Sequence, residues 1–321
     1  MRPACLAIAA LACGAVAAAD TGSFPTRPIR LVVPFAPGGT VDVIARLVSA
    51  RMSGLARQQV VVDNRGGGGG VVGTELVVRA VPDGYTLLLH SAGIAYEPAL
   101  RAKLPYNAMT DLAAISVVGA TPNLLVVPPQ SAARSARDLV QLAKQKPGAV
   151  TYGTGGIGSS SHLAVELFRS IAGVSFNHVP YKGAGPALTE LLGGQIDFMI
   201  ATMPGAVTHV RSNRLRAIGI STLKRSSELP EVPTIAESGV PGYEFVAWFG
   251  LLAPAATTPA RIDEIYALLA RAVESPDLRA RLAAEGVDAQ LTTPKQFQVT
   301  LAAEAARWKK IIEAAGIKAA N

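Results

Sequence analysis

The chain has 321 residues; half of them are hydrophobic, 17% are charged, and the formal net charge is +7. This composition excludes an intrinsically disordered chain, and the length is sufficient for two domains of ordinary size. The basic residues are scattered and are not interleaved with aromatic residues along one stripe, so the sequence predicts no nucleic-acid partner.

The N-terminal segment has the three parts of a secretory signal peptide. Arg2 precedes an apolar stretch at 4–16, and Ala17-Ala18-Ala19 forms an A-x-A cleavage signal. We therefore predict that residues 1–19 form a signal peptide, which is cleaved after Ala19, and that the mature protein is exported.

Both cysteines, Cys5 and Cys13, lie inside this segment. A mature chain without cysteine has no disulfide, no thiol nucleophile and no cysteine metal site. The alternative to cleavage after Ala19 is lipidation of Cys13, because Ala10-Leu11-Ala12-Cys13 loosely approximates a lipoprotein cleavage site.

Short apolar strands alternate with amphipathic helices along the chain, which predicts an α/β fold with largely parallel sheets. The predicted strands are 29–35, 59–63, 85–90, 124–128, 150–153, 196–201, 215–220 and 247–253. The predicted helices are 41–54, 72–80, 135–146, 161–172, 184–193 and 204–212. Three more helices close the chain, one over 262–272, one from Ser275-Pro276 to Gly286, and one from Thr293-Pro294 to Ile312.

A glycine loop at 35–42 joins the first predicted strand to the first predicted helix. Gly38 and Gly39 have no side chains that would cover the unpaired N–H groups of the first helical turn. Those groups and the positive end of the helix dipole form an anion site. Asp42 either caps the helix or meets a donor group of a ligand, and an ordinary strand-to-helix turn is the alternative for this stretch.

A second glycine loop, at 154–162, follows the strand that ends near Tyr152. Its serines are suited to cap the next helix, and the remaining hydroxyl groups and the imidazole of His162 can donate to a ligand carboxylate. If the two loops lie on facing lobes, they would hold both ends of an anionic molecule.

The same loop suggests a rival interpretation, an exported serine hydrolase that uses Ser159, Ser160 or Ser161 with His162. It lacks the G-x-S-x-G nucleophile elbow, however. His90, His162, His178 and His209 are too scattered to predict a metal site.

A literal G-x-G-x-x-G occurs at Gly68, Gly70 and Gly73, after a predicted strand and before a predicted helix. A dinucleotide site also needs an acidic residue at the end of the next strand. Here that strand ends in His90-Ser91. We therefore predict no nucleotide and no other cofactor.

The order of these motifs resembles the Bug receptors, the TctC-type solute-binding proteins of tripartite tricarboxylate transporters. Two of the matching motifs are Pro34-Phe35-Ala36-Pro37-Gly38-Gly39-Thr40-Val41-Asp42 and His178-Val179-Pro180-Tyr181-Lys182-Gly183. The others lie at 24–29, 82–87, 104–106, 152–162, 191–197 and 248–254. The resemblance covers nearly the whole mature chain.

The resemblance implies a type II-like periplasmic binding protein with a ligand cleft between two lobes. The first lobe would comprise 20–122 plus 248–321 and the second lobe 123–247, joined by crossing strands near 122–127 and 247–252. It also implies a periplasmic, non-enzymatic and monomeric receptor, which captures a small organic carboxylate and delivers it to membrane permease subunits. Whether such a permease exists or the protein acts in sensing stays open, as does the choice among dicarboxylates, tricarboxylates and aromatic acids.

The resemblance also implies which residues contact the ligand. The set comprises Phe35, Ala36, Gly38, Gly39, Thr40, Asp42, Ser91, Thr154, Gly155, Ser159, Ser160, His162, Tyr181 and Thr202. Where many relatives have an Asp-Asn pair, this chain has Ala201-Thr202. An ammonium group would lack an acidic partner at that position, which argues against amino-acid ligands.

Overall fold

The computed structural model describes residues 24–101, 103–226 and 228–314. The predicted signal peptide, its cleavage site and both cysteines lie outside these ranges. Within them, every helix is too short or too polar to cross a membrane.

The described chain alternates strands and helices over most of its length. The strands are β1 (Ile29–Val33), β2 (Val60–Asn64), β3 (Thr86–Ser91), β4 (Leu112–Val127), β5 (Thr151–Thr154), β6 (Asn177–Pro180), β7 (Met199–Thr202), β8 (Arg216–Ile220), β9 (Val246–Pro254) and β10 (Asp288–Ala289). The helices are α1 (Thr40–Ala56), η1 (Gly68–Gly70), α2 (Val71–Val78), α3 (Gly93–Leu100), α4 (Ala136–Gln145), α5 (Ser160–Ala172), α6 (Ala184–Leu192), α7 (Met203–Arg211), α8 (Pro259–Val273), α9 (Pro276–Ala284) and α10 (Pro294–Ala314).

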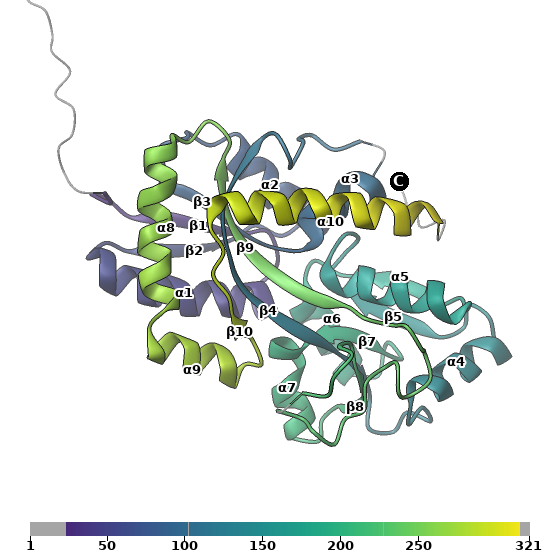
Figure 1. Ribbon diagram of the computed structural model, residues 1–321. Coiled ribbons are helices and arrows are strands. Elements are labelled where there is room, and N and C mark those ends of the chain that lie inside the picture. Colours follow the sequence, from purple (N-terminus) through teal and green to yellow (C-terminus); the bar gives the residue numbers. More distant parts are fainter. Residues whose placement is uncertain (1–23, 102, 227, 315–321) are drawn as a thin grey trace, which may run out of the picture.

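Two long strands, β4 and β9, connect two groups of elements (Figure 1). We call β1–β3, β10, α1–α3 and α8–α10 the first lobe, and β5–β8 with α4–α7 the second lobe. Strand β4 pairs with β9 as far as Pro122 and with β7 from Asn123 onward. One continuous strand therefore belongs to the sheets of both lobes, and it fixes where they meet.

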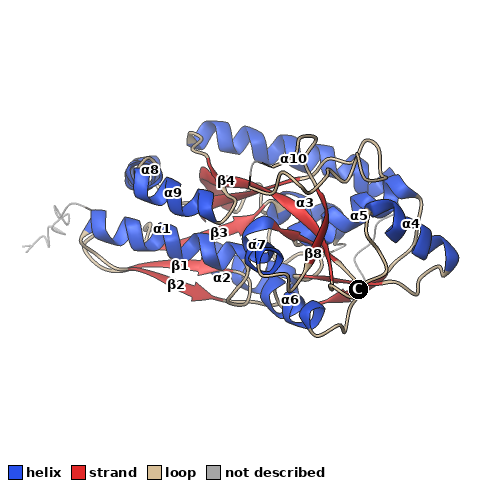
Figure 2. Cartoon of the chain, turned by 90° about the horizontal axis from the view of Figure 1, so that it is seen from below, coloured by secondary structure: helices blue, strands red, loops and turns tan. Residues whose placement is uncertain are grey.

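The main sheet has the order β10-β4-β9-β3-β1-β2, and β7 and β8 add to β4. Strand β1 is parallel to β2 and β3, whereas β9 is antiparallel to β3 and β4. Strands β5 and β6 form a separate parallel pair. Figure 2 shows helices on both sides of the strands. Parallel strands need helical crossovers, so this layering follows from the strand–helix alternation in the sequence.

Five features differ from the sequence prediction. The main sheet is mixed and not largely parallel, because the long strands β4 and β9 run antiparallel to their neighbours. The predicted strand 124–128 is the end of the much longer β4, and Gly119 and Pro122 inside it gave the appearance of a loop. Helix α3 was not predicted because it contains Gly93 and Pro98. The short strands β6 and β10 were also not predicted, since each has too few residues to show an alternating pattern.

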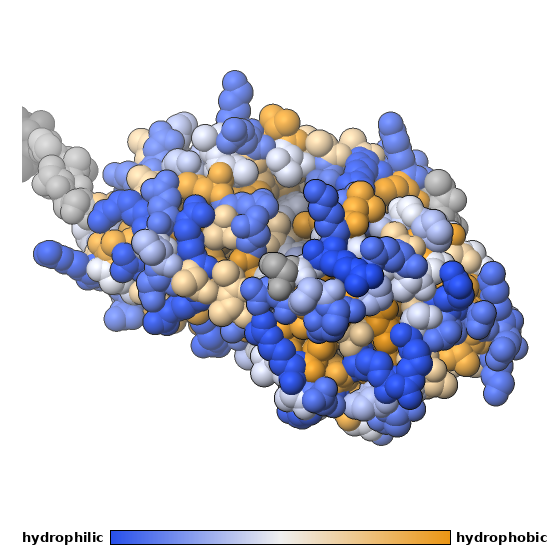
Figure 3. All heavy atoms as spheres, turned by 60° about the horizontal axis from the view of Figure 1, so that its bottom comes forward, coloured by the Kyte–Doolittle hydropathy of each residue, from blue (hydrophilic) through white to orange (hydrophobic). Residues whose placement is uncertain are grey.

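The interior has a large hydrophobic cluster and a smaller one. The smaller cluster packs Leu188 of α6, Met199 of β7 and Ile220 of β8 beneath Leu124 of β4. Helix α10 covers the first lobe, where Trp308 lies 5.1 Å from Tyr96 between ring centroids. In Figure 3 hydrophilic side chains are interspersed with hydrophobic ones over the face that is drawn.

The contact between β9 and α10 yields a test of the packing. A Cβ at Gly250 would lie 2.2 Å from Cζ of Phe297, which is fully buried. We expect Gly250→Ala to lower the free energy of unfolding by about 1–3 kcal/mol, the range for overpacked cores. Gly54→Ala in α1 is the control, because a Cβ there meets nothing within 4 Å. Urea denaturation measures both variants, and a Gly250→Ala variant as stable as the parent chain would contradict this packing.

Candidate functional site

A cavity lies between the two lobes, at the N-terminal ends of α1 and α5. It is lined by Phe35, Gly39, Thr40, Val41, Ser91, Gly155, Ser159, Ser160, Ser161, Ala184, Thr202 and Phe249. Its volume is about 40 Å³, roughly the space needed by three water molecules. None of the lining side chains is charged, so any charge on a ligand would be met by hydroxyl groups and by peptide dipoles.

The first glycine loop, 35–42, is held by an internal cap. The N–H of Gly38 donates to Oδ2 of Asp42 at 3.0 Å, and Arg46 Nε donates to the same oxygen at 3.0 Å. Burial raises the pKa of Asp42, but these hydrogen bonds outweigh it and keep the pKa below its usual value. Asp42 is therefore ionised and stabilises the loop; it does not line the cavity.

The second glycine loop, 154–162, is also fixed by its own side chains. Ser159 is the N-cap of α5, accepting from the N–H of His162 and donating to the carbonyl of Gly156. The N–H of Gly155 donates to Ser161 Oγ at 3.0 Å, and that of Gly158 donates to His162 Nδ1 at 3.3 Å. The loop is thus held in shape by its own hydrogen bonds, and the amides of the first turn of α5 are the ones without an intrahelical partner.

Two stacked imidazoles support this loop. The rings of His162 and His178 are 4.7 Å apart between centroids, and Thr154 Oγ1 lies 2.7 Å from His178 Nε2. Thr154 accepts from the N–H of Gly156, so its own proton is available to His178. Burial lowers the pKa of both imidazoles to about 4. Both are therefore neutral at neutral pH and act as hydrogen-bond acceptors.

This arrangement does not support the serine hydrolase interpretation. His162 Nδ1 is occupied by the N–H of Gly158, and the Ser159 hydroxyl donates to a carbonyl. Among the described residues no hydrogen bond joins the His162 ring to a serine hydroxyl. The general base that a serine nucleophile requires is therefore not in place.

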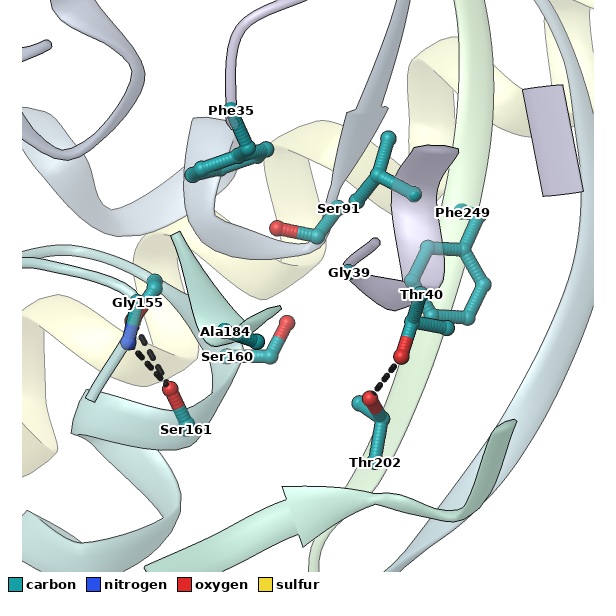
Figure 4. A pocket seen from close by; sticks show the side chains of 12 residues that line it. Phe35, Gly39, Thr40, Ser91, Gly155, Ser160, Ser161, Ala184, Thr202 and Phe249 are labelled. Atoms are coloured by element: carbon teal, nitrogen blue, oxygen red, sulfur yellow. Dashed lines mark hydrogen bonds between the residues drawn. The ribbon is translucent and has the colours of Figure 1, made fainter. Parts of the chain in front are cut away.

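Two buried hydroxyl groups in the cavity have no partner. Ser91, at the end of β3, and Ser160, in the first turn of α5, are 3% and 5% exposed, and neither Oγ makes a hydrogen bond of ordinary geometry within the described chain, although the Tyr96 hydroxyl approaches Ser160. Figure 4 shows both hydroxyl groups directed into the space between the lobes. Buried polar groups are nearly always paired, so this pair marks a place where a polar ligand or water belongs.

Another pair of hydroxyl groups connects the lobes beside the cavity. Thr40 Oγ1, at the start of α1, is hydrogen-bonded to Thr202 Oγ1, at the end of β7 (Figure 4). The phenyl rings of Phe35 and Phe249 provide apolar walls. The cavity therefore combines a polar centre with apolar sides.

The structure brings many of the predicted contact residues to this cavity. Those that line it are Phe35, Gly39, Thr40, Ser91, Gly155, Ser159, Ser160 and Thr202. Those that do not line it are Ala36, Gly38, Asp42, Thr154, His162 and Tyr181. Most of the second group hold the two loops in shape through the hydrogen bonds given above.

The cavity also contains residues that the predicted set lacked, namely Val41, Ser161, Ala184 and Phe249. Ala184 begins α6, and its Cβ would lie 3.7 Å from a Cβ placed at Gly39. The glycine loop before α6 is the sequence feature that could have identified Ala184 as a cavity residue. Phe249 lies on the crossing strand β9, where nothing in the sequence separates a cavity residue from a core residue.

Comparison with known proteins shows which family this chain belongs to. The family model described as "Tripartite tricarboxylate transporter family receptor" matches residues 44–317. Protein BugT of Bordetella pertussis is 38% identical over 307 residues, covering 95% of this chain and 94% of BugT.

Solved structures of related proteins have the same fold as this chain. One from R. palustris, with adipate, has a TM-score of 0.89 and 36% identity, covering 92% of this chain and 99% of that chain. MatC from Rhodopseudomonas palustris, with bound malate, has a TM-score of 0.86 and 31% identity, covering 90% and 100%.

The periplasmic binding protein BugD matches as well, with a TM-score of 0.88 and 31% identity, covering 92% of this chain and 99% of that chain, so the fold is that of an α/β periplasmic binding protein. The chain belongs to the TctC, or Bug, family of tripartite tricarboxylate transporter receptors. It is accordingly a solute receptor and not an enzyme.

The buried imidazoles generate a prediction about pH. Burial lowers the pKa of His90, His162 and His178 to about 4, whereas in an unfolded chain imidazole titrates near about 6.5. Between these values the unfolded chain binds more protons, so stability falls as the pH is lowered through this window. Glu97 has the opposite effect on stability, because burial raises its pKa to about 7. Below that pH the folded chain binds a proton at Glu97 more readily than the unfolded chain does, so this contribution to stability grows as the pH is lowered.

We expect the free energy of unfolding to be lower at pH 5 than at pH 7.5 by a few kcal/mol, measured by urea titration. Glu97→Gln removes the opposing contribution, so its decrease should be larger than that of the parent chain. Equal stability at the two pH values, or a smaller decrease in the variant, would show that these groups titrate normally.

Proposed function

We propose that this receptor binds a small organic carboxylate in the cavity between its lobes. The observation that carries the proposal is the unpartnered pair of buried hydroxyl groups, on Ser91 and Ser160, between the N-terminal ends of α1 and α5. A carboxylate has acceptor sites for several such donors, and helix N-termini favour negative charge.

The binding free energy that a receptor needs supports a site with hydrogen-bond donors from both lobes. A micromolar receptor needs about 8 kcal/mol of net binding free energy. One helix N-terminus contributes at most about 2 kcal/mol, and one hydrogen bond to a charged group contributes roughly 1.5–3 kcal/mol. Several donors must therefore converge, and closure of the lobes around the ligand brings them together while it excludes water.

The lining also restricts the class of ligand. No acidic side chain lines the cavity, so an ammonium group would be buried without a partner at high cost. Amino acids are disfavoured for this reason. The apolar walls and the small volume favour a short acid with an uncharged body, and relatives with adipate and with malate are solved.

The remaining assignments belong to the same proposal. The lobes comprise 20–122 plus 248–321 and 123–247, which agrees with the change of partner strand between Pro122 and Asn123 of β4. The signal peptide at 1–19 is cleaved after Ala19, and the receptor acts as a monomer in the periplasm. It delivers the acid to permease subunits of a tripartite tricarboxylate transporter.

A thermal-shift screen tests the ligand class. A ligand at a hundredfold excess over its Kd stabilises the folded state by about 2.7 kcal/mol. We expect adipate, malate or another short acid to raise the melting temperature, and matched amino acids such as aspartate to have no effect. A shift with aspartate as large as that with malate would contradict the argument from the uncharged lining.

Substitution of Ser160 tests the hydroxyl pair. Ser160→Ala removes one donor from the cavity, and we expect the affinity for the best acid of the screen to fall about tenfold, or about 1.4 kcal/mol, by calorimetry. Ser135→Ala is the matched control, because Ser135 caps α4 away from the cavity. It should lower stability by about 1 kcal/mol and leave the affinity unchanged. Equal affinities for the parent chain and Ser160→Ala would mean that the hydroxyl does not contact the acid.

A further inference from the structure

The glycine run at 66–70, which overlaps the G-x-G-x-x-G pattern, lies in the first lobe and does not line the cavity. In the structure this run faces the second glycine loop of the second lobe. A Cβ at Gly69 would lie 1.8 Å from the carbonyl oxygen of Ile157. A Cβ at Gly93, the first residue of α3, would lie 2.3 Å from the carbonyl oxygen of Gly158. Only glycine permits these approaches.

The guanidinium group of an arginine bridges the two lobes at the same contact. Arg101, which follows α3, donates from Nη2 to the carbonyl oxygen of Gly68 at 2.6 Å and to that of Ile157 at 3.0 Å. The first acceptor is in the first lobe and the second acceptor is in the second lobe. Hydrogen bonds from a charged donor are stronger than those between neutral groups, so this guanidinium ties the lobes together.

We propose that Arg101 and the glycine face formed by Gly69 and Gly93 are the closing contact of this receptor, and that Arg101 is a positioning residue for the second glycine loop. This inference rests on the proposed function, because it assigns the contact a role in ligand capture. The carbonyl groups of Ile157 and Gly158 dock on the first lobe, and the first turn of α5, with the Ser160 hydroxyl, is thereby held over the cavity.

The position of Arg101 explains a second feature of the cavity. Its lining contains no cation, yet the charge of Arg101 acts on the adjacent groups Glu97 and His162. Arg101 therefore supplies positive charge behind the loop without contacting the acid. A separate backbone contact, from the N–H of Ala36 to the carbonyl of Lys182 at 3.0 Å, joins the lobes on the other side of the glycine run.

Disulfide trapping tests closure without any ligand. In a chain carrying Cys5→Ser and Cys13→Ser, the pair Gly39→Cys and Ala184→Cys places two Cβ atoms 3.7 Å apart across the lobes, within the range for a disulfide. The rate of bond formation with diamide, followed by loss of free thiols, reports how often the lobes close. Arg101→Gln and Gly69→Ala should each slow it about tenfold, which corresponds to about 1.4 kcal/mol.

The matched control is Gly148→Ala. Gly148 and Gly69 have similar positive φ values, +74° and +72°, but a Cβ at Gly148 meets nothing within 4 Å. Both substitutions strain the backbone in the same way, and only Gly69→Ala obstructs Ile157. Gly148→Ala should therefore trap at the parent rate. Equal rates for the two alanine variants, or a parent rate for Arg101→Gln, would overturn the proposal.

Calorimetry with malate and adipate separates this inference from the proposed function. If these acids bind the parent chain, Arg101→Gln and Gly69→Ala should weaken their binding about tenfold, while Gly148→Ala binds as the parent does. If trapping responds as expected but no carboxylate binds, the closing contact stands and the ligand class is wrong. If the acids bind all variants equally well, Arg101 does not position the loop.

Discussion

Peptide and hydroxyl groups that are removed from water need partners, and this requirement organises the region between the lobes. In both glycine loops side chains occupy some of the backbone donors: Asp42 takes the N–H of Gly38, and His162 takes that of Gly158. The donors left over face one cavity. In the proposed function, a carboxylate that enters this cavity meets groups held by these hydrogen bonds, so little ordering free energy is lost on binding. The proposed binding mode thus recognises an anion without a charged side chain in contact with it.

Neutral imidazoles are part of the same arrangement. Thr154 can donate to His178, and the N–H of Gly158 can donate to His162, only while each ring nitrogen keeps its lone pair. Burial achieves this by lowering both pKa values. His162, which suggested catalysis in the sequence, is thus a structural support, as is His178, and both act as acceptors. Because His162 lies in the second glycine loop and His178 of β6 stacks on it, protonation of either ring would disturb the shape of this loop.

The sequence was sufficient to predict the α/β class, most helices and both glycine loops, because strand and helix periodicities and capping residues are local. It was insufficient where structure depends on partners distant in the chain. Strand β4 was visible only at its end, because Gly119 and Pro122 interrupt its pattern although pairing with β9 continues. Phe249 and Ala184 line the cavity because of how the lobes meet, which no local pattern records. The part of Asp42 in capping became clear only from its hydrogen bond with the N–H of Gly38.

Glycines in these loops serve different purposes, and one letter in the sequence cannot distinguish them. Gly38 has a positive φ of 83° and makes a turn possible, whereas Gly39 has an extended backbone, and a Cβ there would lie at an ordinary contact distance of 3.7 Å from Ala184. Gly69 combines a positive φ with a close approach to a carbonyl oxygen of the opposite lobe. A glycine run read for phosphate binding in a sequence can therefore be a surface on which another backbone closes. In a two-lobed receptor, the backbone conformation at such a surface affects the stability of the closed state. The stability of the closed state in turn affects the affinity for the ligand.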